Sequence, residues 1–281
     1  MPMQTGENDS GIGGHLRDWR QRRRMSQLDL ACEANISTRH LSFLENGRAA
    51  PSRDMVLRLA EHLEVPLRER NTMLLSAGFA PIYRAKRLND PAFDSIRESI
   101  RALLRAHEPF PALVVDRHWR LLYANRAFNS LVAGVAPALL AEPANVLRLC
   151  LHPDGLAFRI QNLDFWRGAV FSRLNRQIAV TCDPALVDLR DELLAYAGGE
   201  RTQSAEDIDQ SGVGLPLQLK TDAGTLHLLS ALMTIGTPLD VNLSELLIEI
   251  FLPANAETAE ILRQNALDFG DGPDDGTEAG W

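Results

Sequence analysis

The chain has 281 residues, 45% hydrophobic and 23% charged, so it is long enough for one large or two smaller domains with apolar cores. Its formal net charge of −8 argues against a protein that coats nucleic acids or membranes indiscriminately. The charge is uneven, because residues 1–88 carry 14 Lys and Arg against 10 Asp and Glu, whereas the remainder carries 15 against 27. We therefore expect only residues 1–88 to bind a polyanion.

The cysteines and the apolar runs indicate the compartment. Cys32, Cys150 and Cys182 are far apart and odd in number, which favours a reducing environment over a disulfide framework. The N-terminus lacks the apolar stretch of a signal peptide, and the longest uncharged run, 223–239, is short for a membrane helix and interrupted. We predict a cytoplasmic protein that makes no membrane contact.

Residues 13–79 are predicted to form an all-α domain of five short helices, because apolar residues recur there at helical spacing between capping signals. Ser26 followed by Asp29 has the spacing of a capping box, and Ser37 has the position of another N-cap. Two short helices joined by a tight turn, the second with a polar outer face, are typical of a helix-turn-helix.

The third predicted helix carries side chains suited to reading DNA. Arg39 can donate two hydrogen bonds to guanine, and Phe43 or the methyl group of Thr38 can contact a thymine methyl. Gln27 and Arg48 have positions suited to phosphate contacts. The predicted DNA-binding residues are Gln27, Thr38, Arg39, His40, Phe43 and Arg48. The partner that these residues imply is a double-stranded DNA operator.

The rest of the chain has a different texture. Residues 80–108 are predicted to be a linker and a connector helix over 93–107, and residues 109–265 a second domain. Its expected strands are 112–116, 119–124, 215–221, 225–235 and 246–252, and its expected helices are 145–151, 165–179 and 184–197. Strands early and late around central helices predict an α+β domain with an antiparallel sheet. A polar loop is expected at 198–212, and a disordered acidic tail at 266–281.

Two sets of motifs resemble known families. The run MSQLDLACEANISTRHLSFLENGRAAPS is similar to lambda-repressor-like, XRE-type helix-turn-helix domains, a resemblance that implies a bracing pair between Arg20 and Glu45. The runs NVLRLCLHPDGL, GTPLDVNLSELLIEIFLPA and TAEILR resemble the MmyB-like transcription regulators. That resemblance covers about residues 14–265 and implies a PAS-like second domain with an apolar pocket for fatty-acid-like ligands.

Three residues are candidates for the ligand site. Arg159 or Asn162 has the chemistry to anchor a ligand carboxylate, and Trp166 follows them in the chain. The alternative is that Trp166 belongs to the core and that Arg159 pairs with a nearby acid. The scarcity of aromatic residues, 6% of the chain, suggests that rings do not fill such a cavity from within. No cofactor is expected apart from a bound fatty acid.

Three functions are compatible with this organisation. The first is a homodimeric transcription regulator whose second domain senses an apolar ligand. The second is a DNA-binding protein whose second domain serves only dimerisation or partner binding. The third, an enzyme fused to a DNA-binding domain, is disfavoured because the sequence has no nucleophile elbow, no phosphate-binding loop and no histidine or cysteine at metal-ligand spacing. We therefore expect no catalysis and no metal.

Overall fold

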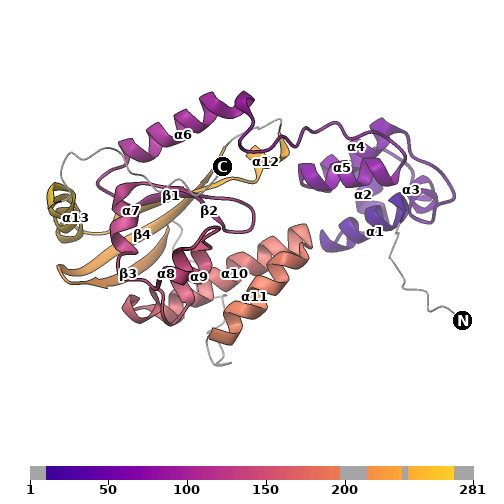
Figure 1. The fold of residues 1–281 in the computed structure, drawn as a ribbon. Coiled ribbons are helices and arrows are strands. Elements are labelled where there is room, and N and C mark those ends of the chain that lie inside the picture. The colour runs from indigo at the N-terminus through magenta and orange to yellow at the C-terminus, as the bar shows by residue number, and fades with distance from the viewer. Residues whose placement is uncertain (1–10, 197–213, 236–239, 269–281) are drawn as a thin grey trace, which may run out of the picture. The chain divides into compact units, whose positions relative to one another are not determined.

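A computed structural model describes residues 11–196, 214–235 and 240–268. The chain divides into two compact units, one formed mainly by residues up to Ala85 and the other mainly by residues from Lys86 on (Figure 1). The first is helical and the second combines helices with an antiparallel sheet, which confirms the predicted fold class. The polar loop expected at 198–212 and residues 269–281 of the expected tail lie outside the described residues.

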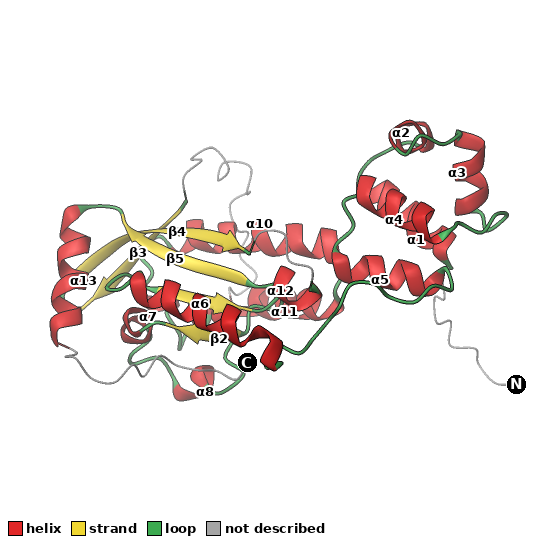
Figure 2. Cartoon of the chain, turned by 90° about the horizontal axis from the view of Figure 1, so that it is seen from above, coloured by secondary structure: helices red, strands yellow, loops and turns green. Residues whose placement is uncertain are grey.

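The first unit is a group of helices around one apolar core (Figure 2). Its helices are α1 (Ile12–Arg22), α2 (Gln27–Glu33), α3 (Thr38–Glu45), α4 (Arg53–His62) and α5 (Leu67–Ser76). Leu16, Leu41 and Leu59, from three different helices, are completely buried in this core. The apolar spacing therefore predicted these buried positions, but not the one in α2, where Leu28 is 60% exposed and Leu30 is buried instead.

Local hydrogen bonds begin the two central helices where the sequence predicts. The Ser26 hydroxyl accepts a hydrogen bond from the backbone N of Asp29 at 3.1 Å, and the Asp29 carboxylate accepts one from the backbone N of Ser26 at 2.7 Å. The Ser37 hydroxyl accepts from the backbone N of His40 at 3.1 Å. The capping box of α2 and the N-cap of α3 are confirmed.

Helix α1 approaches the C-terminal end of α3 very closely at Gly13. A Cβ atom at Gly13 would lie 2.6 Å from the carbonyl oxygen of Leu44 and 2.7 Å from that of Glu45. Only glycine allows this approach, since both neighbouring atoms belong to backbone. The contact fixes the end of α3 against α1.

The second unit is built on a five-stranded sheet. Its strands are β1 (Ala112–Val115), β2 (Leu121–Ala124), β3 (Leu215–Thr221), β4 (Gly224–Thr234) and β5 (Leu247–Pro253). They are arranged in the order β2-β1-β5-β4-β3, and every neighbouring pair is antiparallel. The turn of the β3–β4 hairpin is one residue shorter than predicted, because β4 begins at Gly224, which pairs with Thr221. The φ of Gly224 is +132°, a backbone conformation that suits glycine.

Helices cover both faces of this sheet. The helices from Lys86 on are α6 (Asp94–Ala106), α7 (Arg126–Leu131), α8 (Pro137–Leu140), α9 (Val146–Leu151), α10 (Leu163–Thr181), α11 (Pro184–Tyr196), α12 (Val241–Ser244) and α13 (Ala256–Asp268). Helix α6 lies across one face, and α9 to α11 lie on the other (Figure 1). The central helices therefore fall between β2 and β3 in the chain, as predicted.

Helix α6 differs from the expected free connector over 93–107. Its apolar residues Ile100 and Leu104 are buried in a core shared with Val114 of β1 and Ile248 of β5. This helix is part of the second unit, because the sheet face beneath it would otherwise expose a row of aliphatic side chains. Its bounds, Asp94–Ala106, agree with the helix predicted over 93–107.

Other elements were not predicted from the sequence. The short helices α7 and α8 have too few residues for a periodic signal, and α13 includes residues 266–268 of the expected tail. The sequence of the last predicted strand, 246–252, is also compatible with a helix, and in the structure it forms strand β5. Within the described ranges, no helix is long and apolar enough to cross a membrane.

Candidate functional site

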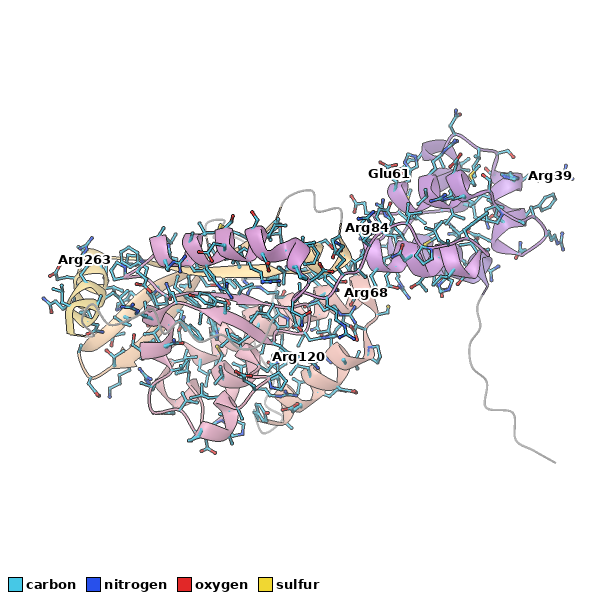
Figure 3. The ribbon with its side chains drawn as sticks, turned by 45° about the horizontal axis from the view of Figure 1, so that its top comes forward. Arg39, Glu61, Arg68, Arg84, Arg120 and Arg263 are labelled. Carbon is cyan, nitrogen blue, oxygen red and sulfur yellow. The ribbon has the colours of Figure 1, made fainter. Side chains whose placement is uncertain are left out.

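The first candidate surface is the outward face of α3. Arg39 is exposed and extends away from the helices of its unit (Figure 3), and its guanidinium lies 5.3 Å from the centroid of the Phe43 ring. Thr38, His40 and Phe43 are half-buried, whereas Leu41 and Leu44 on the opposite face are fully buried. The structure thus places these four predicted residues on one helix, with Arg39 held over an aromatic ring.

A buried carboxylate holds α3 against the other helices. Glu45 is 3% exposed, and its two carboxylate oxygens accept hydrogen bonds from Arg20, at 2.6 Å from Nε and 3.0 Å from Nη2. The Gln27 amide also donates to Oε2 at 2.8 Å. Burial by itself raises the pKa of Glu45, but the hydrogen bonds from Arg20 and Gln27 outweigh it and hold the pKa below its usual value. The Arg20–Glu45 pair implied by the resemblance is therefore present.

Gln27 makes a contact that was not predicted from the sequence. Its amide group was expected to bind a DNA phosphate, and one of its two N–H groups donates to Glu45 in the structure. Arg48, by contrast, is exposed just beyond α3. Gln27 therefore positions α3 from within the unit, and Arg48 keeps a side chain available to a phosphate.

Arg17 of α1 and Arg23, the residue after this helix, also brace backbone groups. The Arg17 guanidinium donates to the carbonyl oxygen of Glu45 at 3.1 Å, and Arg23 Nε donates to the carbonyl oxygen of Leu63 at 2.8 Å. These carbonyls are at the ends of α3 and α4, where a helix leaves acceptors unsatisfied. Much of the basic run in α1 is therefore structural.

The second candidate site is a small cavity in the core between the sheet and the central helices. Its volume is about 30 Å³, room for one or two water molecules. Trp119, Phe128, Trp166 and Phe251 are among the residues that line it. The sequence argument that rings are too scarce to fill the interior was wrong, because the few aromatic residues concentrate here.

Two charged side chains lie at this cavity. Glu249, 3% exposed, accepts a hydrogen bond from the Ser230 hydroxyl, and Arg173 Nη1 lies 3.8 Å from Glu249 Oε1. Burial raises the pKa of Glu249 and lowers that of Arg173. The positive charge of Arg173 partly opposes the rise in the Glu249 pKa, and the negative charge of Glu249 partly opposes the fall in the Arg173 pKa. Burial, strengthened by the charge of Glu249, also raises the pKa of the Cys150 thiol to about 12, so this cysteine is inert as a nucleophile.

Sequence reasoning missed these groups. Within β5, Leu247, Glu249 and Phe251 alternate with residues that face α6, so Glu249 occupies an inward position of an apolar strand. A charged residue in such a position was a detectable signal. Arg173 lies seven residues after Trp166 in α10, two helical turns along the same side.

The structure separates the three residues predicted for the ligand. Trp166 lines the cavity. Arg159 instead donates from Nε to the carbonyl oxygen of Lys220 at 3.0 Å and from Nη1 to that of Leu131 at 2.8 Å. Asn162 donates to the carbonyl oxygen of Pro216 at 2.9 Å and accepts from the backbone N of Gln218 at 2.9 Å. Arg159 and Asn162 therefore bind the β3 backbone rather than line the cavity, a correction to the expected carboxylate anchor.

A larger pocket opens at the surface beside α7 and α8. Its volume is about 360 Å³, and it is lined by Leu121, Phe128, Asn129, Val132, Ala133, Gly134, Leu140, Glu142 and Ala144. Most of these side chains are apolar, and the volume is within the usual range of small-molecule sites. We call it the outer pocket. Phe128 lines both the outer pocket and the cavity.

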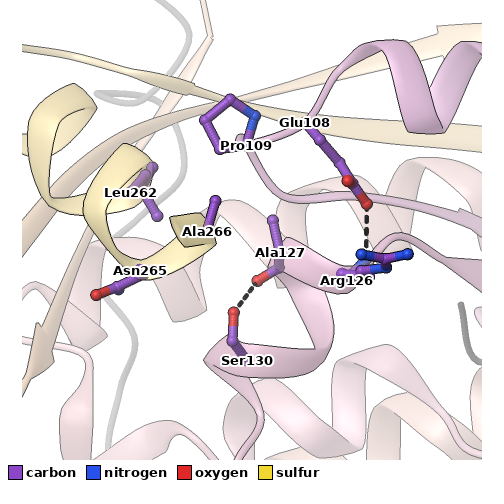
Figure 4. A pocket seen from close by; sticks show the side chains of 8 residues that line it. All are labelled: Glu108, Pro109, Arg126, Ala127, Ser130, Leu262, Asn265 and Ala266. Atoms are coloured by element: carbon purple, nitrogen blue, oxygen red, sulfur yellow. Dashed lines mark hydrogen bonds between the residues drawn. The ribbon is translucent and has the colours of Figure 1, made fainter. Parts of the chain in front are cut away.

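A third hollow, between α7 and α13, is less suited to a ligand (Figure 4). Its volume is about 50 Å³. Two of its polar side chains already have partners, because Glu108 accepts a hydrogen bond from the backbone N of Arg126 at 3.1 Å and Ser130 donates to the carbonyl oxygen of Ala127 at 2.9 Å. In the part of the chain that the structure describes, no group of three His, Cys, Asp or Glu is placed to hold a metal ion.

A helix-turn-helix with an exposed reading face, beside a separate α+β unit with pockets, defines a DNA-binding transcription regulator with a ligand-binding domain. Comparison with family models agrees, since a helix-turn-helix family matches residues 16–70 and the MmyB-like transcription regulator ligand binding domain matches residues 96–264. The second match covers more than half of the chain, and the chain belongs to this family.

The chain was also compared with solved structures and with curated proteins. Among solved structures, the chain is similar to the "Structure of an RNA-binding Light-Oxygen-Voltage Receptor", with 17% sequence identity and a TM-score of 0.28 over 93% of this chain and 63% of that chain. This chain therefore spans less than two thirds of that protein. No curated protein matches the chain.

Proposed function

We propose that this regulator reads one operator sequence through α3 and changes its DNA affinity when a small, mainly apolar ligand of fatty-acid type binds the second unit. The observation that supports the DNA-reading half best is the outward face of α3, with Arg39 held over Phe43 and the helix braced by Glu45 from behind. No catalytic step is part of the proposal, because the regulator families account for both units. We place the protein in the cytoplasm, where a bacterial operator is accessible and free cysteines such as Cys32 stay reduced.

Each residue of this face has a proposed contact. Arg39 binds the O6 and N7 atoms of a guanine, and its stacking on Phe43 orients the guanidinium before DNA binds. Thr38 and Phe43 contact a thymine methyl, and His40 lies next to them in the major groove. Arg48 binds a phosphate and carries no base preference.

Arg39→Ala is expected to relax base preference at one operator position and to cost about 1–3 kcal/mol of discrimination. Arg48→Ala is expected to weaken all sequences alike and to lower the salt slope by about one unit. Binding titrations against the operator and single-base variants at two salt concentrations distinguish the two effects. Arg58→Ala, which removes an exposed arginine of α4, is the charge-matched control. Unchanged discrimination in Arg39→Ala would show that another residue reads the base.

The active form is proposed to be a homodimer on a two-fold symmetric site. One helix-turn-helix offers few base contacts, and two copies double them at half-sites about 10 base pairs apart or a multiple of that spacing. The stoichiometry of the same titration, two chains per operator, checks this.

The outer pocket is the proposed entry of the ligand site. Helix α7 lines it, and the buried Asn125 side chain ties this helix to α6, because its oxygen accepts from the backbone N of Phe128 at 3.1 Å and its nitrogen donates to the carbonyl oxygen of Leu104 at 3.2 Å. A ligand that moves α7 therefore acts on α6, the helix that follows the linker from the DNA-binding unit. Regulation requires that the ligand bind one of the two conformations more tightly.

The experiment that tests this half uses the full-length protein. Organic-solvent extraction of the purified protein is expected to release a lipid, and operator affinity is expected to differ before and after its removal. Fatty acids of different chain lengths are then added to the lipid-free protein. The one whose chain length fits the site is expected to shift the melting temperature of the protein. No extractable lipid, no melting shift and unchanged operator affinity would together overturn ligand sensing.

One observation favours a second candidate function. The internal cavity of about 30 Å³ shows a core filled by its own side chains. A second unit that serves only dimerisation or partner binding needs no more than this. The extraction experiment decides between the two, because this alternative predicts no lipid and no ligand-dependent change in DNA affinity.

A further inference from the structure

The core cavity contains an unpaired hydrogen-bond donor. The Nε1 atom of Trp166 is buried and makes no hydrogen bond to any residue that the structure describes. The indole N–H partly opposes the rise in the pKa of the Cys150 thiol, so it faces this sulfur, which is a weak acceptor. A buried donor without a partner is destabilising, so its retention calls for another reason.

The second tryptophan at the cavity provides a direct comparison. Trp119 lines the same space, and its Nε1 donates to Oε1 of Gln177 at 2.9 Å. The fold therefore satisfies one indole N–H at this cavity and leaves the other without a partner. The difference lies in the surroundings of Trp166 and not in a general lack of acceptors in this core.

A charged residue also lines the cavity. The closest contact of the Arg173 guanidinium with Glu249, 3.8 Å, is longer than a hydrogen bond. The guanidinium also lies 5.7 Å from the centroid of the Trp119 ring, and these two contacts leave some of its five N–H donors for another oxygen. Trp166 and Arg173 thus bring hydrogen-bond donors to one small space whose other walls are mainly apolar.

Phe128 lines both this cavity of about 30 Å³ and the outer pocket of about 360 Å³. A ligand that reaches from one to the other has to displace this side chain. Such a ligand would meet mainly apolar side chains in the outer pocket and the donors of Trp166 and Arg173 in the cavity. This polarity fits an elongated ligand with an oxygen at its leading end.

We propose that the Trp166 indole N–H and the Arg173 guanidinium form an inner polar subsite that binds a hydrogen-bond acceptor oxygen, carbonyl or carboxylate, of a ligand whose apolar chain extends past Phe128 into the outer pocket. The subsite rests on the proposed ligand-sensing function and assigns the ligand's orientation within it. Arg159 and Asn162 then contribute to the shape of the domain and not to ligand recognition.

Binding to the full-length protein tests the subsite with three probes of similar chain length. Octane lacks an oxygen, 2-octanone has a neutral carbonyl and octanoic acid has a carboxylate. Headspace partition measures the first two, and titration calorimetry measures the acid. Trp166→Phe removes the N–H and keeps an aromatic ring, and is expected to weaken 2-octanone and octanoic acid about three- to tenfold while leaving octane unchanged.

Trp119→Phe is the matched control, because it makes the same change at the same cavity but breaks an existing hydrogen bond. It is expected to lower the melting temperature and to leave the ratio of 2-octanone to octane affinity unchanged. Trp166→Phe without ligand is expected to lower the melting temperature less than Trp119→Phe, since both variants lose ring volume but only Trp119→Phe breaks a hydrogen bond. If Trp166 has a purely structural role, Trp166→Phe is expected to lower the melting temperature at least as much as Trp119→Phe and to leave the ratio of 2-octanone to octane affinity unchanged.

The outcomes separate this inference from the function on which it rests. If the wild type binds none of the three probes, ligand sensing through this site and the subsite are both overturned. If it binds all three and Trp166→Phe weakens octane as much as 2-octanone, the subsite alone is wrong.

Discussion

Arg20→Met is expected to cost the helical unit about 3–5 kcal/mol, the typical loss when one partner of a buried ion pair is removed. The reason is Glu45, whose carboxylate is 3% exposed and receives two hydrogen bonds from this guanidinium. Without Arg20, only Gln27 and the more distant Arg17 face it. Urea unfolding followed by far-ultraviolet circular dichroism measures the loss.

The pH dependence is expected to change sign with this substitution. In the wild type the pKa of Glu45 is below its ordinary value of 4.5, so its contribution is present above that pH and is lost as pH falls through the native pKa. In Arg20→Met, burial without the guanidinium raises the pKa. The variant's deficit is therefore expected to shrink as pH falls below 4.5.

Two further variants make the test specific. Arg58→Met removes an exposed arginine of α4 and is expected to change stability by less than about 0.5 kcal/mol. The double variant Arg20→Met, Glu45→Leu is expected to recover most of the loss, because an apolar pair replaces the buried charges. A loss below about 1 kcal/mol in Arg20→Met would contradict the role of the pair.

Asn125→Ala is expected to cost the second unit about 3–5 kcal/mol, because each buried polar group left unpaired costs about 1–3 kcal/mol and such costs are not additive. Asn125 is 1% exposed. Its oxygen accepts from the backbone N of Ala112 at 3.0 Å and of Phe128 at 3.1 Å, and its nitrogen donates to the carbonyl oxygens of Leu104 at 3.2 Å and Phe110 at 2.8 Å. Thermal unfolding measures the loss.

Hydrogen exchange locates the effect. The amide of Ala112 is expected to exchange faster in Asn125→Ala, since its acceptor is gone, whereas the amide of Phe128 keeps the backbone carbonyl of residue 125 as an acceptor. Asn129→Ala, also on α7 and half-buried, is the matched control and is expected to leave both amides protected. Equal protection in Asn125→Ala and the wild type would show that these bonds do not hold α7 to the sheet.

Sequence reasoning succeeded where the cause of a structure lies within a few residues. The hydroxyl of Ser26 and the carboxylate of Asp29 are three positions apart, so the capping box could be recognised directly. The alternation in β5 and the apolar spacing in α4 depend on the period of a strand or a helix. Short helices such as α7 gave no comparable signal.

The amino-acid sequence by itself determined the two-part organisation, the helix-turn-helix and the exposure of Arg39, because capping, periodicity and charge are local properties of the chain. Only the tertiary structure decided which polar groups meet. Gln27 reaches Glu45 across 18 positions, and Arg159 reaches the carbonyl of Lys220 across 61. Such partners are chosen by how helices and strands pack, since each buried polar group bonds to whatever acceptor or donor the fold brings within reach.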